Sequence, residues 1–176
     1  MRIVSGKYKG RAINPPRNLR ARPTTDFAKE NLFNVLGNLV DFEECDVLDL
    51  FAGTGQLGIE CLSRGAAQAV FVDRRADAVK LIRENLKVTE LTDRARVVAG
   101  DSMEYLKSLR EPFDIVLLDP PYAAGLLEPA IEHLTTFDIL NPHGIIVAEH
   151  PADRALPPVE PPFSTMMTLF TPESTA

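Results

Sequence analysis

Four consecutive residues have the types and order needed to hold an amino group: Asp119-Pro120-Pro121-Tyr122. An exocyclic amine on a base is a poor nucleophile because its lone pair is delocalised into the ring. The Asp119 carboxylate and the Pro120 carbonyl could accept its two hydrogens and turn the lone pair toward an electrophilic methyl group. Proline rigidity would fix both acceptors, and the Tyr122 ring could stack on the base. We therefore predict that Asp119, Pro120, Pro121 and Tyr122 are catalytic residues for methyl transfer to an amino nitrogen.

A glycine-rich segment that follows an apolar run is typical of a cofactor-binding loop. It reads Asp49-Leu50-Phe51-Ala52-Gly53-Thr54-Gly55-Gln56-Leu57-Gly58-Ile59-Glu60. Gly53 and Gly55 allow the backbone to turn sharply and to approach a ligand, and a helix after them would present unpaired N–H groups. The spacing also satisfies GxGxxG, so a nicotinamide or flavin site stays open on this segment alone.

Aspartates end three successive apolar runs, at Asp49, Asp73 and Asp101. Asp73 could accept two ribose hydroxyl hydrogen bonds, and Asp101 could accept an adenine amino group. Such a series suits a ligand with an ammonium group, ribose hydroxyls and an exocyclic amine, and suits a pyrophosphate poorly. The competing interpretation is that each aspartate caps the next helix. The predicted cofactor is S-adenosyl-L-methionine, and the residues predicted to bind it are Asp49, Phe51, Gly53, Gly55, Asp73, Arg74, Asp101, Ser102 and Asp119.

A sheet must position these motifs, and the hydrophobic pattern predicts one. Short apolar runs at 47–51, 69–72, 95–99, 115–118 and 145–148 are separated by helix-length segments such as 75–88 and 126–137. Runs that are apolar on both faces and joined by helices predict an α/β, doubly wound, mostly parallel sheet over residues 26–176. A covering helix should begin near Asp26, with Thr24 or Thr25 as its N-cap. In this architecture ligands bind at the carboxyl ends of the strands, where the motifs stand.

Residues 1–25, which we call the basic arm, differ from the rest in charge. They hold seven basic residues and no acidic one, a charge of +7 against −13 for the remainder. A small hairpin is expected around residues 7–10, followed by extended chain at 14–24. Phosphate contacts depend on local charge, so the arm could bind RNA or DNA, although a solvated surface would look the same. The residues predicted to contact nucleic acid are Lys7, Lys9, Arg11, Arg20 and Arg22.

Composition narrows the remaining choices. With 176 residues, 45% hydrophobic and 25% charged, the chain fits one globular domain behind the arm. It has no apolar run of about 18 residues and no signal-peptide pattern, so a cytoplasmic location without membrane contact is expected. We also predict a monomer. Cys45 and Cys61 lack CxxC spacing and the three histidines are dispersed, so we predict neither a disulfide nor a metal site.

Taken together, the glycine-rich segment, Asp73, Asp101 and the Asp-Pro-Pro-Tyr motif resemble those of Rossmann-like S-adenosylmethionine-dependent methyltransferases acting on amino nitrogens. The N-terminal segments Arg2–Arg11, Arg22–Asp26 and Lys29–Asn34 are similar to those of the bacterial RsmD-type small-subunit ribosomal RNA (guanine-N2) methyltransferases. The match spans about residues 1–150. It implies methylation at N2 of a guanine in 16S ribosomal RNA, presented by the small ribosomal subunit or an assembly intermediate. The chain departs from this family at the proline-rich residues 151–163, after which only Ser164–Phe170 could form a sixth strand.

Three alternatives stay open on the sequence. Enzymes that methylate adenine or cytosine amino groups in DNA also use Asp-Pro-Pro-Tyr, although this chain has no room for a sizeable target-recognition domain. An NAD-dependent oxidoreductase would use the GxGxxG spacing, but no substrate domain is evident. A non-catalytic RNA-binding assembly factor would need only the basic arm.

Overall fold

The structure is a computed structural model, and it describes residues 1–15, 25–121, 124–137, 139–150, 153, 156, 158–159, 161 and 163–164. Helices and strands alternate along these residues: α1 (Asp26–Leu39), β1 (Asp46–Asp49), α2 (Gln56–Ser63), β2 (Gln68–Asp73), α3 (Ala76–Val88), the short 3-10 helix η1 (Thr92–Arg94), β3 (Ala95–Ala99), α4 (Ser102–Ser108), β4 (Phe113–Leu118), α5 (Leu127–Thr136) and β5 (Leu140–Ala148).

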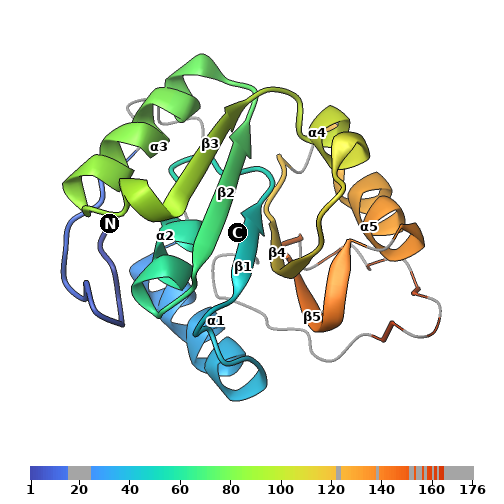
Figure 1. Ribbon diagram of the computed structural model, residues 1–176, viewed down its shortest axis with the longest axis horizontal. Coiled ribbons are helices and arrows are strands. Elements are labelled where there is room, and N and C mark those ends of the chain that lie inside the picture. The colour runs from blue at the N-terminus through green and yellow to red at the C-terminus, as the bar shows by residue number, and fades with distance from the viewer. Residues whose placement is uncertain are drawn as a thin grey trace.

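The five strands form one parallel sheet in the order β3-β2-β1-β4-β5 (Figure 1). The chain first builds outward from β1 to β3 and then returns to place β4 on the other side of β1. This reversal puts a topological switch point between β1 and β4, where open α/β sheets bind their ligands. Asp49 is in register with Leu117, so the glycine-rich segment and the Asp-Pro-Pro motif leave the sheet side by side. The predicted doubly wound α/β fold is confirmed.

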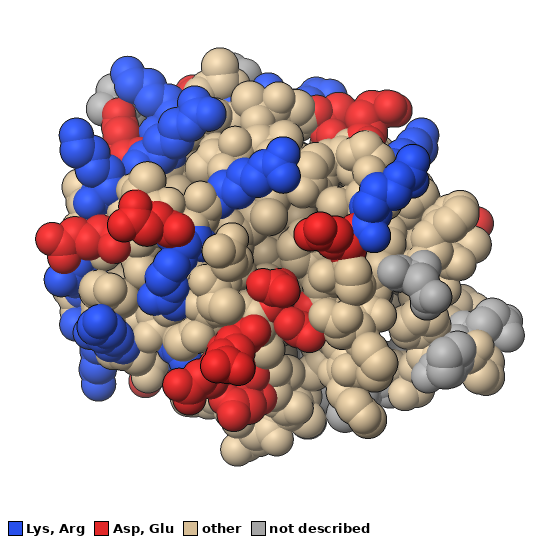
Figure 2. Space-filling model, viewed as in Figure 1, with Lys and Arg blue, Asp and Glu red and all other residues tan. Residues whose placement is uncertain are grey.

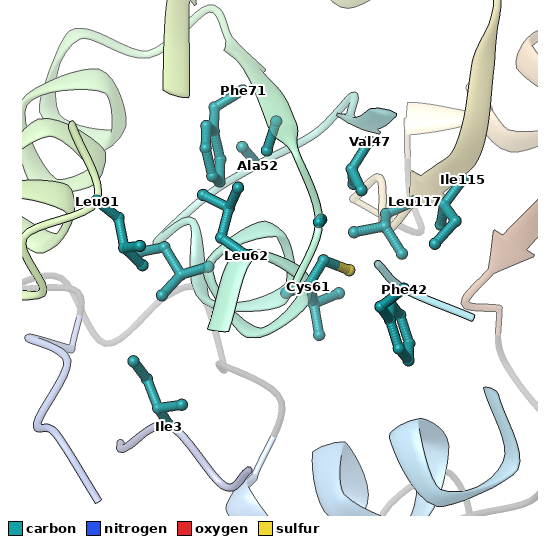
Figure 3. Close-up of a cluster of buried hydrophobic side chains, with 14 of the residues drawn as sticks. Ile3, Phe42, Val47, Ala52, Cys61, Leu62, Phe71, Leu91, Ile115 and Leu117 are labelled. Carbon is teal, nitrogen blue, oxygen red and sulfur yellow. The ribbon is translucent and has the colours of Figure 1, made fainter. Parts of the chain in front are cut away.

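Helices cover both faces of the sheet, and each face has its own core. The first core cluster joins the N-terminal segment, α1, α2 and α3 to one face of the sheet, and it includes Ile3, Ile13, Phe33, Leu36, Ile59, Leu62, Ile82, Val47, Phe71, Ile115 and Leu117 (Figure 3). The second core cluster joins α4 and α5 to the other face through Leu48, Leu50, Val72, Leu106, Val116, Leu118, Ala130, Ile131 and Leu134. Neighbouring residues of β1 therefore point to opposite faces, as the period of a strand requires.

Helix α1 begins where the sequence predicted. Thr25 is its N-cap, and its Oγ1 accepts the Ala28 N–H at 3.2 Å. Asp26 in the first turn adds a negative charge at the positive end of the helix dipole. The helix buries Phe33 and Leu36 in the first core cluster, so it is the amphipathic cover that the spacing indicated.

The described part of the basic arm packs against α2. Arg2 pairs with Ala12 in an antiparallel bridge, which confirms the predicted hairpin. Gly6 has a φ of +84° and lies so close to α2 that an added Cβ would overlap the Ser63 carbonyl group. Ile3 is fully buried in the first core cluster, and Figure 3 shows its side chain reaching toward α2. Residues 1–15 are therefore part of the packed domain surface.

Strand β5 starts at Leu140, so it is longer than the apolar run at 145–148 suggested. Pro142 interrupts the apolar pattern there, and His143 adopts a φ of +66° beside a register shift against β4. Proline is tolerated here because β5 is at the edge of the described sheet. The sixth strand expected within Ser164–Phe170 falls almost entirely outside the described residues.

None of the helices in the part of the chain that the structure describes is long and apolar enough to cross a lipid bilayer.

Candidate functional site

The glycine-rich loop is held between the strands that flank β1. The Leu50 N–H donates to the Leu117 carbonyl at 3.1 Å, and the Ala52 N–H donates to the Val72 carbonyl at 3.0 Å. Gly53 and Gly55 then turn the chain at φ values of +58° and +79°. Among the described residues, no atom lies within 4 Å of the position that a Cβ on Gly53 would occupy, so the loop presents its backbone to open space within this part of the structure. This is the side on which a ligand could approach.

The third glycine of the GxGxxG spacing has a packing role. Gly58 lies in the first turn of α2, and an added Cβ would overlap Phe71 Cε1 and lie 2.8 Å from Phe71 Cζ. The same Cβ would lie 3.2 Å from Asp49 Oδ2. Glycine at this position therefore lets α2 approach β1 and β2 closely.

Asp49 is almost fully buried, with 2% of its surface exposed. Its Oδ2 accepts the Gly58 N–H at 3.2 Å, so it satisfies one of the unpaired donors at the start of α2. Burial raises the pKa of Asp49 to about 7, the Gly58 hydrogen bond opposes this, and the nearby Asp73 charge adds to it. The predicted contact of Asp49 with a cofactor stays a prediction, whereas its contact with the loop is a feature of the structure.

Asp73, at the end of β2, lies beside the glycine-rich loop. Its Oδ2 accepts the Gly53 N–H at 3.0 Å, and its Oδ1 accepts the Arg75 N–H at 2.9 Å. The Asp73 side chain keeps 12% of its surface exposed, and Arg74 beside it is exposed. Two predicted cofactor-binding residues, Gly53 and Asp73, are thus brought together at one point.

Asp101 caps the helix that follows it, as the competing interpretation expected. Its Oδ1 accepts the Glu104 N–H at 3.0 Å at the start of α4. The residue is exposed, so the cap leaves room for the predicted adenine contact. The buried Ser102 hydroxyl donates to the Leu50 carbonyl and ties α4 to the loop. Phe51 is half-buried against the second core cluster. Phe51 and Ser102 therefore support the loop, and their contact with a cofactor stays a prediction.

The catalytic motif begins directly after β4. Asp119 is partly buried, Pro120 is buried and Pro121 is exposed, whereas Tyr122 lies outside the described residues. Burial raises the pKa of Asp119 well above its usual range. The Glu149 carboxyl group raises it further, through charge repulsion and a hydrogen bond to Asp119, and Asp49 adds a smaller repulsion. Asp119 is thus a carboxyl group that retains its proton unusually strongly.

Glu149 is a site residue that the sequence reasoning missed. Its N–H donates to the Leu118 carbonyl at 2.8 Å, which extends the pairing of β4 and β5 to the edge where Asp119 stands. The signal that could have found it was present, because Glu149 is an acidic residue that directly follows an apolar run. The same rule had selected Asp49, Asp73 and Asp101.

The predicted RNA-binding residues fall into three groups. Lys7 and Lys9 are exposed on the hairpin. The Arg11 guanidinium donates to the Thr89 carbonyl and to Glu90, both at 2.9 Å, so part of its hydrogen-bonding capacity is already used. Figure 2 shows Lys and Arg side chains gathered where the N-terminal segment and α3 lie in Figure 1, with acidic side chains among them. Arg20 and Arg22 lie outside the described residues.

A second missed residue, Asn85, links the basic arm to the loop. It is fully buried on α3, and its Oδ1 accepts the Asn14 N–H at 2.8 Å. Its Nδ2 donates to the Asn14 carbonyl at 3.2 Å and to the Thr54 carbonyl at 2.9 Å. Thr54 lies between Gly53 and Gly55, so one amide side chain holds both the end of the hairpin and the glycine-rich loop.

Both cysteines, Cys45 and Cys61, are free thiols, and Cys61 is buried. Among the described residues, no group of three or more His, Cys, Asp or Glu side chains is placed to hold a metal ion.

Comparison with known proteins gives one consistent result. Residues 1–168 match the family described as conserved hypothetical protein 95. A Bacillus subtilis protein named "Putative rRNA methyltransferase YlbH" is 41% identical over 160 residues, which cover 89% of this chain and 86% of the relative. The Escherichia coli K12 protein named ribosomal RNA small subunit methyltransferase D is 39% identical over 160 residues, covering 90% and 79%. A solved structure described as "Putative methyltransferase yhhF from Escherichia coli" superposes with a TM-score of 0.86 at 33% identity, covering 97% of this chain and 92% of that one.

Proposed function

Because the chain belongs to the RsmD family, which carries the description conserved hypothetical protein 95, we propose that this methyltransferase methylates N2 of a guanine in 16S ribosomal RNA, with S-adenosyl-L-methionine as donor. The observation that carries the proposal is the switch point of the sheet, where the glycine-rich loop after β1 stands beside Asp119 and Pro120 after β4. The oxidoreductase interpretation is set aside, since the matched family and these relatives are methyltransferases.

The residues at the loop fit S-adenosyl-L-methionine. The Gly53 backbone faces open space, and the partly exposed Asp73 carboxylate beside it can accept ribose hydroxyl hydrogen bonds. No Lys or Arg occurs between Asp49 and Gly58, so the loop has no side-chain cation for a pyrophosphate. When bound, the cofactor supplies a methyl group on a positively charged sulfur.

Asp119 and Pro120 orient the nucleophile. The Pro120 carbonyl and the Asp119 carboxylate can each accept one hydrogen of the amino group, which directs the nitrogen lone pair away from both acceptors. Burial of Pro120 and the pairing of β4 with β1 and β5 fix these acceptors. The proton that leaves the nitrogen can pass to the Asp119 carboxylate, whose raised pKa makes it a stronger base than an exposed aspartate.

The basic arm supplies RNA contacts in this proposal. Lys7 and Lys9 are exposed and can reach phosphates, and the target base is flipped out toward Asp119. Arg11, Arg20 and Arg22 are further candidates for phosphate contact. The proposed partner is the small ribosomal subunit or its assembly intermediate, and we propose a monomer that acts in the cytoplasm.

The deciding experiment is a methylation assay with labelled S-adenosyl-L-methionine on undermethylated small subunits, on naked 16S RNA and on duplex DNA. We expect label in the RNA of the particles, recovered as N2-methylguanosine after digestion. Asp119→Ala should lose the label while retaining the wild-type melting temperature, and Asp153→Ala, at an exposed aspartate, is the matched control. Label only in DNA, or on adenine, would contradict the proposal.

A further inference from the structure

Asp119 and Glu149 stand side by side at the ends of two adjacent parallel strands. Leu117 pairs with Val147 in register, and both side chains contact the first core cluster. Leu118 pairs with Ala148, and the Glu149 N–H donates to the Leu118 carbonyl at 2.8 Å. Because side chains in register on parallel strands share a face, residues 119 and 149 continue the face of Leu117 and Val147. The hydrogen bond between the two carboxyl groups agrees with this placement.

The three bases with an exocyclic amine differ in the atom next to it. In guanine the N2 amino group lies beside N1–H, a donor. In adenine the N6 amino group lies beside N1, and in cytosine the N4 amino group lies beside N3, and both of these ring nitrogens are acceptors. An acceptor pair such as Asp119 and Pro120 can hold the amino group of any of the three. A second carboxylate beside that pair would bond to the N1–H of guanine and would face a lone pair in the other two.

We propose that Glu149 is a specificity-determining residue that accepts the N1–H of the target guanine while Asp119 and Pro120 hold its N2 amino group. The inference rests on the proposed function and deepens it, because it assigns the choice of base to one side chain. Guanine then offers three hydrogens to three acceptors that directly follow β4 and β5. A proton held by Asp119, whose pKa is raised, leaves to solvent as the base enters. Glu149 is half-buried, so water replaces a missing partner only in part.

The test uses 2-aminopurine, which keeps the 2-amino group but has an acceptor at N1. Small subunits are reconstituted with RNA in which the mapped target guanosine is replaced by 2-aminopurine riboside. Methylation is measured at several pH values up to mildly alkaline buffer, because the raised pKa of Asp119 favours its protonated form at lower pH. For the wild-type protein we expect kcat/KM on 2-aminopurine to be about 10- to 100-fold below that on guanosine. Equal values for the two bases would overturn the inference.

Glu149→Gln separates the N1 contact from other differences between the two bases, since a glutamine amide can donate to the N1 acceptor of 2-aminopurine. We expect the variant to lose about 10- to 100-fold in kcat/KM on guanosine and to lose most of its preference over 2-aminopurine. Glu132→Gln, at an exposed glutamate on α5, is the matched control and should keep both values. An equal loss on both bases would mean that Glu149 only supports Asp119, and would overturn the inference.

The outcomes separate a failure of the proposed function from a failure of the role of Glu149. If the wild-type protein does not methylate guanosine in the particle, the proposed function itself fails. If it does, and the preference is the same in Glu149→Gln, only the role of Glu149 fails. Should Glu149→Gln not fold, as judged from its melting temperature and its binding of S-adenosylhomocysteine, the wild-type comparison of the two bases still decides.

Discussion

The Asp49 carboxylate and the Gly58 N–H are joined by a hydrogen bond of 3.2 Å across the junction between β1 and α2. Each residue requires the other. A side chain at position 58 would press on Asp49 Oδ2 and on Phe71, and loss of the carboxylate would leave a helix N–H without its acceptor. The glycine-rich loop between them is thereby held at both ends.

Asp49→Asn should reduce the pH dependence of stability. The pKa of Asp49 is raised to about 7 in the folded protein from 3.8, so the folded state binds the proton more tightly than the unfolded state. Its contribution to stability is therefore complete below about pH 4 and is lost, by roughly 2–4 kcal/mol, as the pH rises to about 7. An asparagine keeps an oxygen for Gly58 and cannot ionise. Urea denaturation at about pH 5 and at about pH 8 gives the free energy of unfolding at each pH. Between the two values this free energy should fall less for the variant than for the wild type, and an identical fall would disprove the prediction.

Gly58→Ala should destabilise the protein, whereas Gly37→Ala should not. An added Cβ at position 58 overlaps the Phe71 ring, which is buried and cannot move away, so a cost of about 1–3 kcal/mol is expected. Gly37 is also in a helix, α1, and no atom of the residues that the structure describes lies within 4 Å of its added Cβ. Alanine there should stabilise by about 0.5–1 kcal/mol through helix propensity. Thermal unfolding of both variants is the measurement, and a neutral Gly58→Ala would refute the packing role.

The methylation rate should rise with pH as Asp119 loses its proton. Burial raises the pKa of Asp119 well above its usual range, and the carboxyl groups that add to this shift are Glu149, directly after β5, and Asp49 at the end of β1. Only the ionised Asp119 carboxylate accepts the amino hydrogen as a charged acceptor, so kcat/KM should increase as the pH rises through the pKa of Asp119. Removing the Glu149 charge lowers the pKa of Asp119, so the profile of Glu149→Gln should move to lower pH. Profiles of both proteins that coincide would count against the coupling.

The lysines of the arm should affect RNA binding, and Arg11 should also affect stability. Lys7→Gln combined with Lys9→Gln removes two exposed charges, so binding to the particle should weaken. The slope of log affinity against log salt concentration should become shallower by about two. Arg11→Gln additionally breaks the bonds to Thr89 and Glu90, so its melting temperature should fall. Lys107→Gln, on α4 at the other face of the sheet, serves as the matched control. A salt slope that the double substitution leaves unchanged would exclude phosphate contact.

The sequence predicted those parts of the fold that depend on local sequence patterns. The strand runs, the start of α1 at Thr25 and the three glycines depend on residues a few positions apart. Asn85 was missed because a polar residue in an amphipathic helix looks like surface, and its partners are 71 and 31 positions away in the chain. The first half of β5 was hidden by Pro142, which is acceptable only because the strand is at an edge. Such long-range pairings have no local signature.

The sequence could not show which site residues face the cofactor and which ones support the loop. The sequence assigned Asp49 and Ser102 to the cofactor, whereas the structure shows bonds from both to the loop that would carry it. A residue type at the end of a strand identifies the region of a site. Whether its side chain faces the ligand or the supporting backbone depends on packing, which only the folded chain defines.

The docking of the hairpin on α2 and α3 has a consequence during synthesis. Ile3 belongs to the first core cluster, and the hairpin bonds to Ser63, Asn85 and Glu90. Translation proceeds from the N-terminal to the C-terminal side, so the cationic arm emerges before these partners do. Until residue 90 has left the exit tunnel, Ile3 and the positive charges around it are exposed beside the ribosome's own anionic RNA. The nascent chain is therefore open to premature electrostatic capture until residue 90 has emerged, and the closing of the core ends that period.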